Sequence, residues 1–299
     1  MKHLQALLNI QTNFEIDCIV ACDTNPSVLN SIQLTGIERH QHPETLVETF
    51  QLDAVIIATP DGSHYELGKQ FLSQDVDVFV EKPLATTFDH ASSLVSLSIE
   101  EGKVLKSGFL LRFHPCIQQA RSQIHAGRIG SIQSIRYCKK SRRSGNNGLH
   151  ALDSLAIHGI DLAEFLLKGQ TPLRISEVLG DRMNSELTLE FPNQVEIHVD
   201  VGWGANQDIA HLEILGANGR ISIQLADHST YNIDGDDSET CYVHSMYTPL
   251  ESVLLDFIQG DVSAFAASTG SILRTIKCVE HARSKLMSLG RFNTRELKR

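Results

Sequence analysis

The first third of the chain alternates short apolar runs with amphipathic segments, and this alternation constrains the fold more than any other feature. The run "AVIIA" at Ala54–Ala58 is apolar at every position, as in a strand buried on both faces of a sheet. Strands and helices in alternation, with short polar connections, are typical of a parallel sheet covered by helices. The expected strands are Ile16–Cys22, Ala54–Ala58, Val76–Val80 and Val104–Gly108, and the expected helices are Leu4–Gln11, Ser27–Leu34, Tyr65–Ser73 and Thr87–Glu101.

After about residue 130 the pattern changes to strands that follow one another, with turns between them. The turns "FPNQ" and "GANGR" have the composition of hairpin connections. One helical pattern interrupts the strands over Ser154–Leu167, and a last helical region runs from about Pro249 to Leu289, with a break at Gly260–Ser268. The expected strands of this half are Ile132–Lys139, Glu186–Phe191, Gln194–Val201, His211–Leu215 and Gly219–Leu225.

The two patterns predict two domains, one α/β and one α+β. Residues 1–110 are expected to form a Rossmann-like domain with a parallel sheet, and residues 111–299 a substrate-binding domain with a large, mostly antiparallel sheet. A large open sheet seldom stays uncovered, so its exposed face is expected to be an oligomer interface.

Composition narrows the classes of function. The chain has 299 residues and a formal net charge of -10, which argues against nonspecific nucleic-acid binding. No apolar run is long enough for a membrane span, and no signal peptide is recognised. Cys18 and Cys22 are interpreted as buried free thiols, which predicts a reducing, cytoplasmic location. No metal site is expected, and His40 and His42 are assigned to a solvated loop.

Asp23 directly follows the apolar run Ile16–Cys22. An acidic residue at the end of the second strand of a nucleotide-binding fold accepts hydrogen bonds from the adenosine ribose hydroxyls. Its carboxylate also repels a 2′-phosphate, so Asp23 favours NAD over NADP. The alternative is that Asp23 or Thr24 caps the helix that begins near Pro26.

The stretch "AVIIATPDGSHYELGKQFLSQDVDVFVEKPLA" resembles the Gfo/Idh/MocA oxidoreductases, which are NAD(P)-dependent dehydrogenases of sugars, inositols and nucleotide sugars. The turn "ATPDGSH" and the motif "VEKPLA" match the most specific signature of that family. The segments "SGFLLRFHP", "GLHALDSLAIHGIDLAEFLL" and "TPLESVLLDFIQ" match its domain junction, its active-site helix and the start of its final helices, in the same order. The resemblance covers nearly the whole chain and implies homodimers or homotetramers.

Lys82, in the motif "EKP", would stand at the carboxyl end of a buried parallel strand, where open sheets place their ligands. An ammonium group there can hydrogen-bond a substrate hydroxyl and stabilise the alkoxide that forms as hydride leaves. Partial burial would lower its pKa and suit it to proton transfer. Pro83 fixes the turn, and the resemblance favours a cis bond between Lys82 and Pro83. The alternative, a surface Glu–Lys pair, would contribute little.

His158 and Asp161 lie three residues apart and share one face of the expected helix. A neutral imidazole is a suitable general base for alcohol oxidation. The resemblance implies that His158 takes the substrate proton and that Asp161 contacts substrate hydroxyls. Taken without the resemblance, a lone histidine on a helix is more often structural.

One position departs from the family pattern. The family has an acid one turn before the histidine, and this chain has Ser154 there, with Asp153 one residue earlier. On a continuous helix Asp153 would lie about 140° around the axis from His158, so it could reach the imidazole only if the helix begins after it. Ser154 can orient an imidazole but cannot stabilise its charged form as a carboxylate does. Asp153 and Ser154 are therefore carried as candidates for the catalytic and the substrate-binding role.

The resemblance implies further contacts to both ligands. Arg112 and His114, at the domain junction, would line the nicotinamide and substrate pocket. The basic segment of Lys139, Arg142 and Arg143 could meet a substrate phosphate, or it could be a solvated loop. The candidate cofactor-binding residues are Asp23, Thr24, Ala58, Thr59, Pro60, His64, Glu81, Lys82 and Arg112, and the candidate substrate-binding residues are Lys82, His114, Ser154, His158 and Asp161.

A glycine-rich phosphate turn normally lies about 20 residues before the ribose-binding acid. Counted back from Asp23, that turn and the strand before it would fall at or before the first residues, so neither is expected in this chain. Either Ile16–Cys22 then closes up against Ala54–Ala58, or a gap remains between them. The simplest account is a shortened reading frame, a wrong start codon or a partial gene, and the alternative is a natural derivative that has given up catalysis.

The sequence thus predicts a dehydrogenase that transfers a hydride between NAD and a hydroxyl carbon of a sugar, a polyol or a nucleotide sugar. The alternative is a non-catalytic ligand-binding or regulatory relative, which the missing phosphate turn and Ser154 favour.

Overall fold

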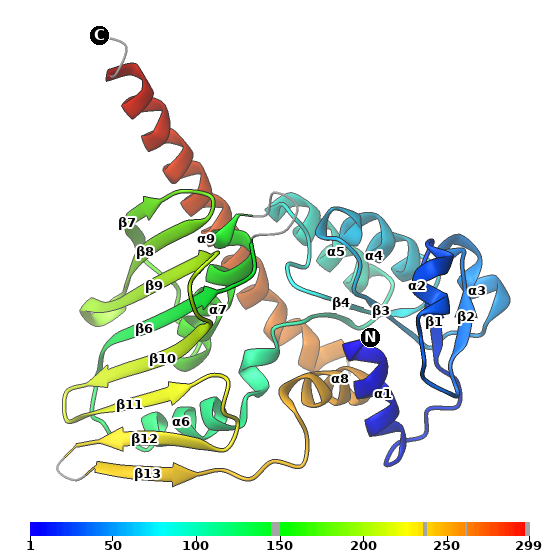
Figure 1. Ribbon diagram of the computed structural model, residues 1–299, viewed down its shortest axis with the longest axis horizontal. Coiled ribbons are helices and arrows are strands. Elements are labelled where there is room, and N and C mark those ends of the chain that lie inside the picture. Colours follow the sequence, from blue (N-terminus) through cyan, green and yellow to red (C-terminus); the bar gives the residue numbers. More distant parts are fainter. Residues whose placement is uncertain (145–149, 236–237, 261, 297–299) are drawn as a thin grey trace.

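The computed structural model describes residues 1–144, 150–235, 238–260 and 262–296. Its two parts lie side by side, with the long helix α9 (Val262–Glu296) between them (Figure 1). The N-terminal part holds the short parallel strands, and the other part is built on one broad sheet. The fold class predicted from the sequence is confirmed, because parallel strands in the first part are followed by a large and mostly antiparallel sheet.

The parallel strands form two separate sheets. One sheet pairs β1 (Val20–Cys22) with β2 (Glu38–His40), and the other has the order β3–β4–β5. Among the described residues no backbone ladder joins β1 to β3, so of the two arrangements left open by the sequence, the structure has the gap. Strands β3, β4 and β5 span Ala54–Ile57, Asp77–Val80 and Leu105–Ser107.

Helices and turns cover these strands, and several begin at residues with an evident capping function. Pro26 occupies the first turn of α2, and the Asn25 side chain accepts from the Ser27 N–H, so Asn25 is the cap rather than Asp23 or Thr24. The Thr87 side chain caps α5 in the same way. The helices and 3₁₀ turns of this part are α1 (Lys2–Gln11), α2 (Pro26–Asn30), η1 (Pro43–Thr45), α3 (Leu46–Thr49), η2 (Asp61–Ser63), α4 (His64–Leu72), α5 (Phe88–Glu100) and η3 (Leu110–Phe113).

The second part is an eight-stranded sheet in the order β13–β12–β11–β10–β6–β9–β8–β7. Only the β6–β9 pair is parallel, and both predicted hairpin turns connect antiparallel neighbours, β8 to β9 and β10 to β11. The strands are β6 (Ile132–Ser141), β7 (Arg174–Gly180), β8 (Asn184–Phe191), β9 (Val195–Trp203), β10 (Ile209–Gly216), β11 (Gly219–Gln224), β12 (Thr230–Asp234) and β13 (Ser238–Tyr242), with the 3₁₀ turn η6 (Pro192–Gln194) between β8 and β9.

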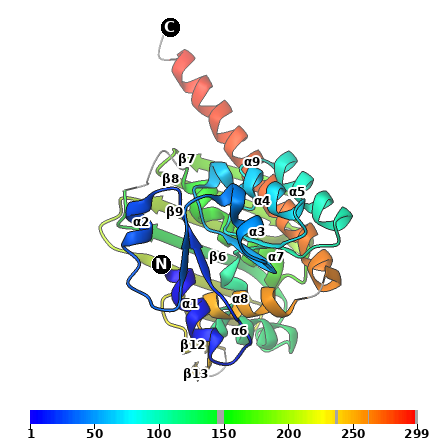
Figure 2. The ribbon, with the colours of Figure 1, turned by 90° about the vertical axis from the view of Figure 1, so that its right-hand side faces the viewer.

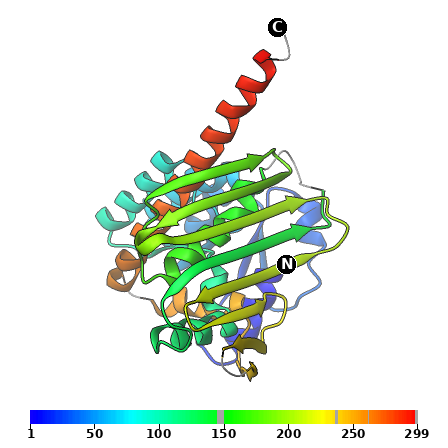
Figure 3. The same cartoon turned by 90° about the vertical axis from the view of Figure 1, so that its left-hand side faces the viewer.

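Helices pack on one face of this sheet, and no helix of the described residues lies on its other face (Figure 3). The covering helices are α6 (Pro115–His125), α7 (Ile157–Leu166) and part of α9, with the π-helix η5 (Leu152–Ala156) directly before α7. The predicted helix Ser154–Leu167 is therefore two segments of different pitch. Helix α8 (Pro249–Gln259) begins at a capping box formed by Thr248 and Glu251.

The last helices differ from the expectation in one respect. Helix α8 ends at Gln259 and α9 already begins at Val262, so the break is shorter than the predicted Gly260–Ser268, within which Asp261 lies outside the described residues. Figures 1 and 2 show the final turns of α9 extending well beyond the body of the protein. None of the described helices is both long and apolar enough to cross a membrane.

The buried apolar side chains form one large core that runs through both parts and a second, small cluster around β1 and α2. The small cluster contains Ile19, Ala21, Leu29, Ile32 and Ile37. The interpretation of Cys18 as a buried thiol is wrong, because Cys18 precedes the short strand β1 and is exposed, while Cys22 is half-buried. All six cysteines are free.

Candidate active site

Lys82 stands directly after β4, at the carboxyl end of the strand, as the sequence predicted. The bond between Lys82 and Pro83 is cis. The Lys82 ammonium donates a hydrogen bond from Nζ to the main-chain oxygen of Ser154, 2.9 Å away. Burial lowers the pKa of Lys82, and the nearby carboxylates of Glu81 and Asp61 only partly oppose that shift.

The carbonyl that Lys82 binds belongs to the π-helix η5, at Leu152–Ala156. Single π turns recur at functional sites, where they shift a backbone group out of the regular helical position. Ser154 therefore contributes its main-chain oxygen to the site, at the position where the family pattern has an acidic side chain. The contact joins the turn after β4 to the segment that leads into α7.

His158 lies in the first turn of α7 and is half-buried. Its ring meets the ring of Phe109 edge-on, with centroids 6.5 Å apart, and its Nδ1 is buried with no hydrogen-bond partner among the described residues. Burial, and then the positive charges of Lys82 and Lys139, lower the pKa of His158 to about 3. The imidazole is consequently uncharged at neutral pH.

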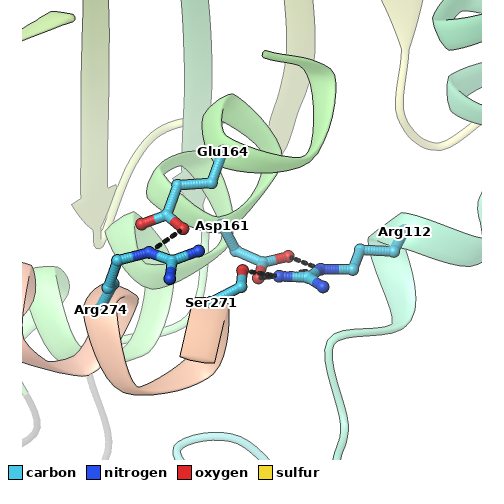
Figure 4. A network of polar contacts seen from close by, with 5 residues as sticks. All are labelled: Arg112, Asp161, Glu164, Ser271 and Arg274. Atoms are coloured by element: carbon cyan, nitrogen blue, oxygen red, sulfur yellow. Dashed lines mark hydrogen bonds and ion pairs between the residues drawn. The ribbon is translucent and has the colours of Figure 1, made fainter. Parts of the chain in front are cut away.

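Asp161, one turn further along α7, is bound to Arg112 (Figure 4). The guanidinium donates from Nε to both carboxylate oxygens, at 3.0 and 2.9 Å, and from Nη2 to Oδ1 at 2.5 Å. Nη2 also reaches Ser271 Oγ on α9 at 2.5 Å. Asp161 is 1% exposed and forms an ion pair with Arg112. The roles of the two residues in binding substrate or nicotinamide stay predictions.

A second buried carboxylate follows on the same helix. Glu164 accepts a hydrogen bond at Oε2 from Arg274 Nε of α9, 3.1 Å away, while its Oε1 is buried without a partner among the described residues (Figure 4). Burial raises the pKa of Glu164 to about 7, because Arg274 compensates only part of the desolvation. Both carboxylates of α7 are thus engaged by arginines that come from other elements.

The sequence makes Asp153 a candidate catalytic residue. In the structure its carboxylate lies against α9. Both of its oxygens lie 3.0 Å from Arg283 Nη1. Asp153 has no hydrogen bond to His158 among the contacts of the described residues. The imidazole therefore lacks the carboxylate partner that the family pattern supplies, and a catalytic role for Asp153 stays a prediction.

On the cofactor side, the turn after β3 is open to solvent. Ala58, Thr59 and Pro60 are exposed there, at the carboxyl end of the strand. Asp23 follows β1 and is half-buried, and its Oδ1 accepts from the Asn25 N–H at 2.8 Å. Thr24 is exposed beside it. These residues lie where the sequence placed them, and their cofactor contacts stay predictions.

His64 was also carried as a cofactor-binding residue, but its side chain is fully buried. Its Nδ1 lies 2.8 Å from the Pro83 oxygen and its Nε2 lies 2.9 Å from the Thr59 oxygen. The ring therefore connects the turn after β3 to the turn that carries Lys82, which is a structural role and leaves no ring surface for a cofactor.

Glu81, beside Lys82, binds a residue that the sequence did not point to. His3 of α1 lies with its Nε2 2.8 Å from Glu81 Oε1, and the Lys82 N–H donates to Glu81 Oε2 at 3.1 Å. Burial alone would raise the pKa of Glu81, but these two hydrogen bonds outweigh it and the pKa is lowered. Glu81 is therefore an ionised carboxylate close to Lys82.

No hydrogen bond or ring contact joins His114 to Lys82 or His158 among the described residues. It is fully buried, and its ring lies edge-on to that of His228, with centroids 4.8 Å apart. Burial, and then His228, lower the pKa of His114 to about 4. Its predicted contact with substrate has no support in these contacts. Its position at the start of α6 makes it a packing residue.

Phe109 was not singled out from the sequence, and Lys139 was named there only as part of a basic segment that could meet a substrate phosphate. Phe109 packs against the imidazole, and Lys139 influences its charge from β6. Residues of β6 alternate between the two faces of the sheet, with Ile135, Tyr137 and Ser141 buried, so the alternation would have placed Lys139 on the helix-covered face. Arg142 and Arg143 are exposed, and residues 145–149 of the basic segment lie outside the described residues.

No group of three or more histidine, cysteine, aspartate or glutamate side chains within the described ranges could hold a metal ion. The candidate site is thus Lys82 and His158, with the Ser154 carbonyl, the aromatic ring of Phe109 and the charge of Lys139.

Comparison with known proteins supports the fold described above. Residues 1–109 match the model of an oxidoreductase family with an NAD-binding Rossmann fold, and residues 117–222 match the C-terminal domain of the GFO/IDH/MocA proteins. Among solved structures, a dehydrogenase from Chromobacterium violaceum superposes with a TM-score of 0.82 at 19% identity, over 99% of this chain and 94% of the other. A UDP-N-acetylglucosamine 3-dehydrogenase from Acidithiobacillus ferrooxidans superposes with a TM-score of 0.79 at 18% identity, over 96% and 94% of the two chains.

The relatives found by sequence match this chain over only part of their own length. A 2,7-anhydro-N-acetylneuraminate hydratase from Escherichia coli is 25% identical over 74% of this chain, and the match spans 64% of the hydratase. Inositol 2-dehydrogenase 2 from Saccharopolyspora erythraea is 26% identical over 74% of this chain, and the match spans 69% of that enzyme. The two family matches together cover most of the chain and carry the motifs around Lys82 and His158, and the chain belongs to the Gfo/Idh/MocA oxidoreductase family.

Proposed function

We propose that this protein is a dehydrogenase that transfers a hydride between NAD and a hydroxyl carbon of a sugar, a polyol or a nucleotide sugar. The observation that carries the proposal is the contact between Lys82 Nζ and the Ser154 carbonyl. It brings the lysine at the end of a parallel strand to the segment that leads into the helix of His158, so two side chains able to move a proton converge from the two parts of the fold.

The residues on the cofactor side suit a dinucleotide. Asp23 uses one carboxylate oxygen for the Asn25 N–H, which leaves the other to accept from ribose hydroxyls. The turn at Ala58, Thr59 and Pro60 is exposed at the carboxyl end of β3, where open sheets bind their ligands. These residues, with Glu81, would hold the cofactor, which supplies the hydride-accepting carbon when bound. The Asp23 carboxylate supports NAD over NADP, because it would repel a 2′-phosphate.

Lys82 and His158 divide the proton chemistry in this proposal. The lowered pKa of Lys82 allows it to release a proton near working pH while still donating a hydrogen bond to the hydroxyl oxygen. Above its lowered pKa Lys82 is a neutral amine, which takes the hydroxyl proton as hydride leaves the carbon, so the hydroxyl becomes a neutral carbonyl. The ammonium formed on Lys82 hydrogen-bonds that oxygen. His158 is uncharged, so its imidazole can hydrogen-bond the substrate without repelling Lys82.

The class of substrate rests on relatives. An inositol 2-dehydrogenase and a neuraminate-derivative hydratase are among the sequence relatives, and a nucleotide-sugar dehydrogenase shares the fold. All three act on molecules with hydroxylated rings. A polyhydroxylated ring is therefore the proposed substrate, and a nucleotide sugar is one form of it.

We also propose an oligomeric state, which the open face of the sheet supports, and a cellular compartment, which the cysteines support. The face of the eight-stranded sheet that carries no helix (Figure 3) presents Arg136, Lys140, Glu186, His198 and Asp200, a mixed-charge surface that a second copy can pair with. We therefore propose a homodimer or homotetramer formed through this face. Six free cysteines support a reducing, cytoplasmic compartment.

A second candidate function is non-catalytic ligand binding, which is favoured by the separation of β1 and β3 into different sheets. A protein whose nucleotide domain is divided in this way could bind a sugar without transferring hydride. Equilibrium binding of NADH separates the two functions, because only the dehydrogenase needs it.

The test of the proposed function is NAD reduction with a panel of myo-inositol, D-glucose and UDP-N-acetylglucosamine. Lys82→Ala and His158→Ala are each expected to lower the rate by ~10²–10⁴-fold, the usual contribution of a positioned acid or base. Lys140→Met, which removes a lysine on the opposite face of β6, is the control and is expected to retain the rate. Wild-type rates in both active-site variants would contradict the proposal.

A further inference from the structure

Lys139 lies on the face of the sheet that meets the active-site helix. In β6 the alternate residues Ile135, Tyr137 and Ser141 are buried under the helices, and Lys139 belongs to the same series. Tyr137, its neighbour in that series, lies against Gly159: a Cβ added to this glycine would come within 2.6 Å of the Tyr137 ring. Gly159 directly follows His158, so β6 brings Lys139 to the end of α7 that holds the imidazole.

Lysines from two elements therefore come near His158: Lys82, which follows β4, and Lys139 of β6. Lys82 and Lys139 both act on the charge of His158, and no carboxylate is among the groups that do so. The acidic side chains of this region point elsewhere, since Asp161 is bound to Arg112 and Asp153 to Arg283. At residue 154, where the family has an acid one turn before the histidine, this chain has a serine. In a protein with a net charge of -10, this is a locally positive region.

The two lysines differ in how much negative charge faces them. Glu81 and Asp61 offset part of the charge of Lys82 from the cofactor side. Lys139 forms no hydrogen bond and no ion pair with any residue that the structure describes. The exposed Asp208 feels its charge, but the pKa of Asp208 is lowered first by the Arg142 N–H, and the two side chains are not within ion-pair distance.

The next residue along the strand shows the contrast. Lys140 points to the open face of the sheet and is ion-paired with Asp200 of β9. Lys139 and Lys140 are thus consecutive lysines on opposite faces of one strand, of which the outer one has a carboxylate and the inner one has none. Half-buried cations without an anionic partner are uncommon, because burial disfavours charge.

We propose that Lys139 binds an anionic substituent of the substrate, a carboxylate or a phosphate on the sugar. This inference rests on the proposed function and narrows its substrate class from polyhydroxylated rings to acidic sugars. A lysine ammonium recognises either group as a point charge. An anion there would also offset the positive charge that Lys82 and Lys139 place around His158, so an acidic substrate would fit the site better than a neutral one of the same size.

The test uses three sugars that differ only at carbon 6: D-glucuronate, D-glucose 6-phosphate and D-glucose. The chain has one tryptophan, Trp203, which pairs with Ser141 across β6 and β9, two residues along from Lys139, so its fluorescence reports binding near this lysine. Titrations are made with and without NADH. Wild type is expected to bind at least one acidic sugar about tenfold or more tightly than glucose, in line with a hydrogen bond to a charged group.

Lys139→Met is expected to abolish that preference, and Lys140→Met to keep it. Lys139→Gln serves as a second variant if Lys139→Met does not fold by circular dichroism. Preference for glucuronate alone assigns a carboxylate, and preference for the 6-phosphate alone assigns a phosphate. The proposal is overturned if neither acidic sugar binds more tightly than glucose, or if the preference survives in both Lys139 variants.

The same titration keeps this inference separate from the proposed function, because it needs no turnover. If the preference for acidic sugars depends on Lys139 but the protein reduces NAD with none of the sugars, the dehydrogenase proposal is contradicted and the anion site is supported. Hydride transfer to neutral sugars with no charge preference would do the reverse.

Discussion

The guanidinium of Arg112 donates to both carboxylate oxygens of Asp161, which lies 49 residues further along the chain. This pair connects the turn η3, directly after the parallel strands, to the helix α7 that carries His158. The guanidinium of Arg112 also lies over the ring of Phe109, 5.9 Å from its centroid, and that ring packs against His158. The ion pair therefore helps to hold α7 against the part of the protein that contains the parallel strands.

Replacing Arg112 tests this connection. Asp161 is 1% exposed, so Arg112→Met would leave a buried carboxylate without its partner, at an expected cost of about 3–5 kcal/mol in the free energy of unfolding. Arg112→Lys should cost less but still destabilise the protein, because an ammonium cannot reproduce the two-pronged contact. The measurement is urea unfolding followed by circular dichroism. The matched control is Arg128→Met, which breaks an ion pair with Glu239 whose side chains are 54% and 55% exposed, and a loss of under about 1 kcal/mol is expected there. Equal losses in Arg112→Met and Arg128→Met would contradict the assigned role.

Glu164 predicts a pH dependence of stability. Its pKa is raised from 4.5 to about 7 in the folded protein, so the folded state binds a proton more tightly than the unfolded state does. The stabilisation that protonated Glu164 provides is fully present below about pH 4.5 and is lost as pH rises through 7. The change is on the order of 3 kcal/mol at most, from about 1.4 kcal/mol per pKa unit.

Urea unfolding of wild type and Glu164→Gln between pH 5 and pH 8 measures this. The amide cannot ionise, so the difference in unfolding free energy between variant and wild type should grow in favour of the variant as pH rises. A difference that stays constant across the range would show that Glu164 does not titrate there.

Gly159 is expected to tolerate no side chain. A Cβ at this position would lie 2.6 Å from Cδ1 of the buried Tyr137, and protein interiors are too densely packed for a ring to move freely. Gly159→Ala should destabilise the protein by about 1–3 kcal/mol, as overpacked cores do. It should also lower turnover, because His158 is the adjacent residue. Gly62→Ala is the control, since nothing lies within 4 Å of its Cβ position, and thermal unfolding should distinguish the two. An unchanged melting temperature in Gly159→Ala would refute the close contact.

The pH profile of NAD reduction should follow Lys82 rather than His158. The pKa of His158 is lowered to about 3, so the imidazole is neutral throughout the range in which the enzyme can be assayed. Lys82, whose pKa is lowered by burial, is the group that changes charge, and kcat/KM for oxidation should rise with pH as it loses its proton. In His158→Gln the rate should fall while the limb stays in place. A limb near pH 6.5 that disappears in His158→Gln would show that the histidine titrates instead.

The strands and the lysine of the "EKP" motif could be predicted because their signals are local. An apolar run such as Ala54–Ala58 has few alternatives to a buried strand, and the residue that follows such a strand lies at the ligand-binding edge. The edge strand β13 was missed because most of its residues are exposed, so it lacks the alternation of a half-buried strand. Helix α6 was missed because polar residues such as Gln118 and Arg121 occupy much of its sequence.

The partners of the acidic side chains could not be predicted. Asp153 meets Arg283, 130 residues away, and Glu164 meets Arg274, 110 residues away, and both arginines come from α9. Spacing along one helix shows which residues share a face, but not which distant charge will lie opposite. This is why the ion pair of Asp161 with Arg112 was not predicted, while the contact of Asp161 with substrate stays a prediction.

The division of the nucleotide part into two sheets is the feature that most directly challenges the proposed function. NADH fluorescence titration of the wild-type chain addresses it, with Asp23→Ala as the variant and circular dichroism as the check of folding. The account predicts saturable binding of NADH with a micromolar Kd, weaker binding of NADPH, and a loss of the preference for NADH in Asp23→Ala. A folded protein that binds neither dinucleotide would contradict it.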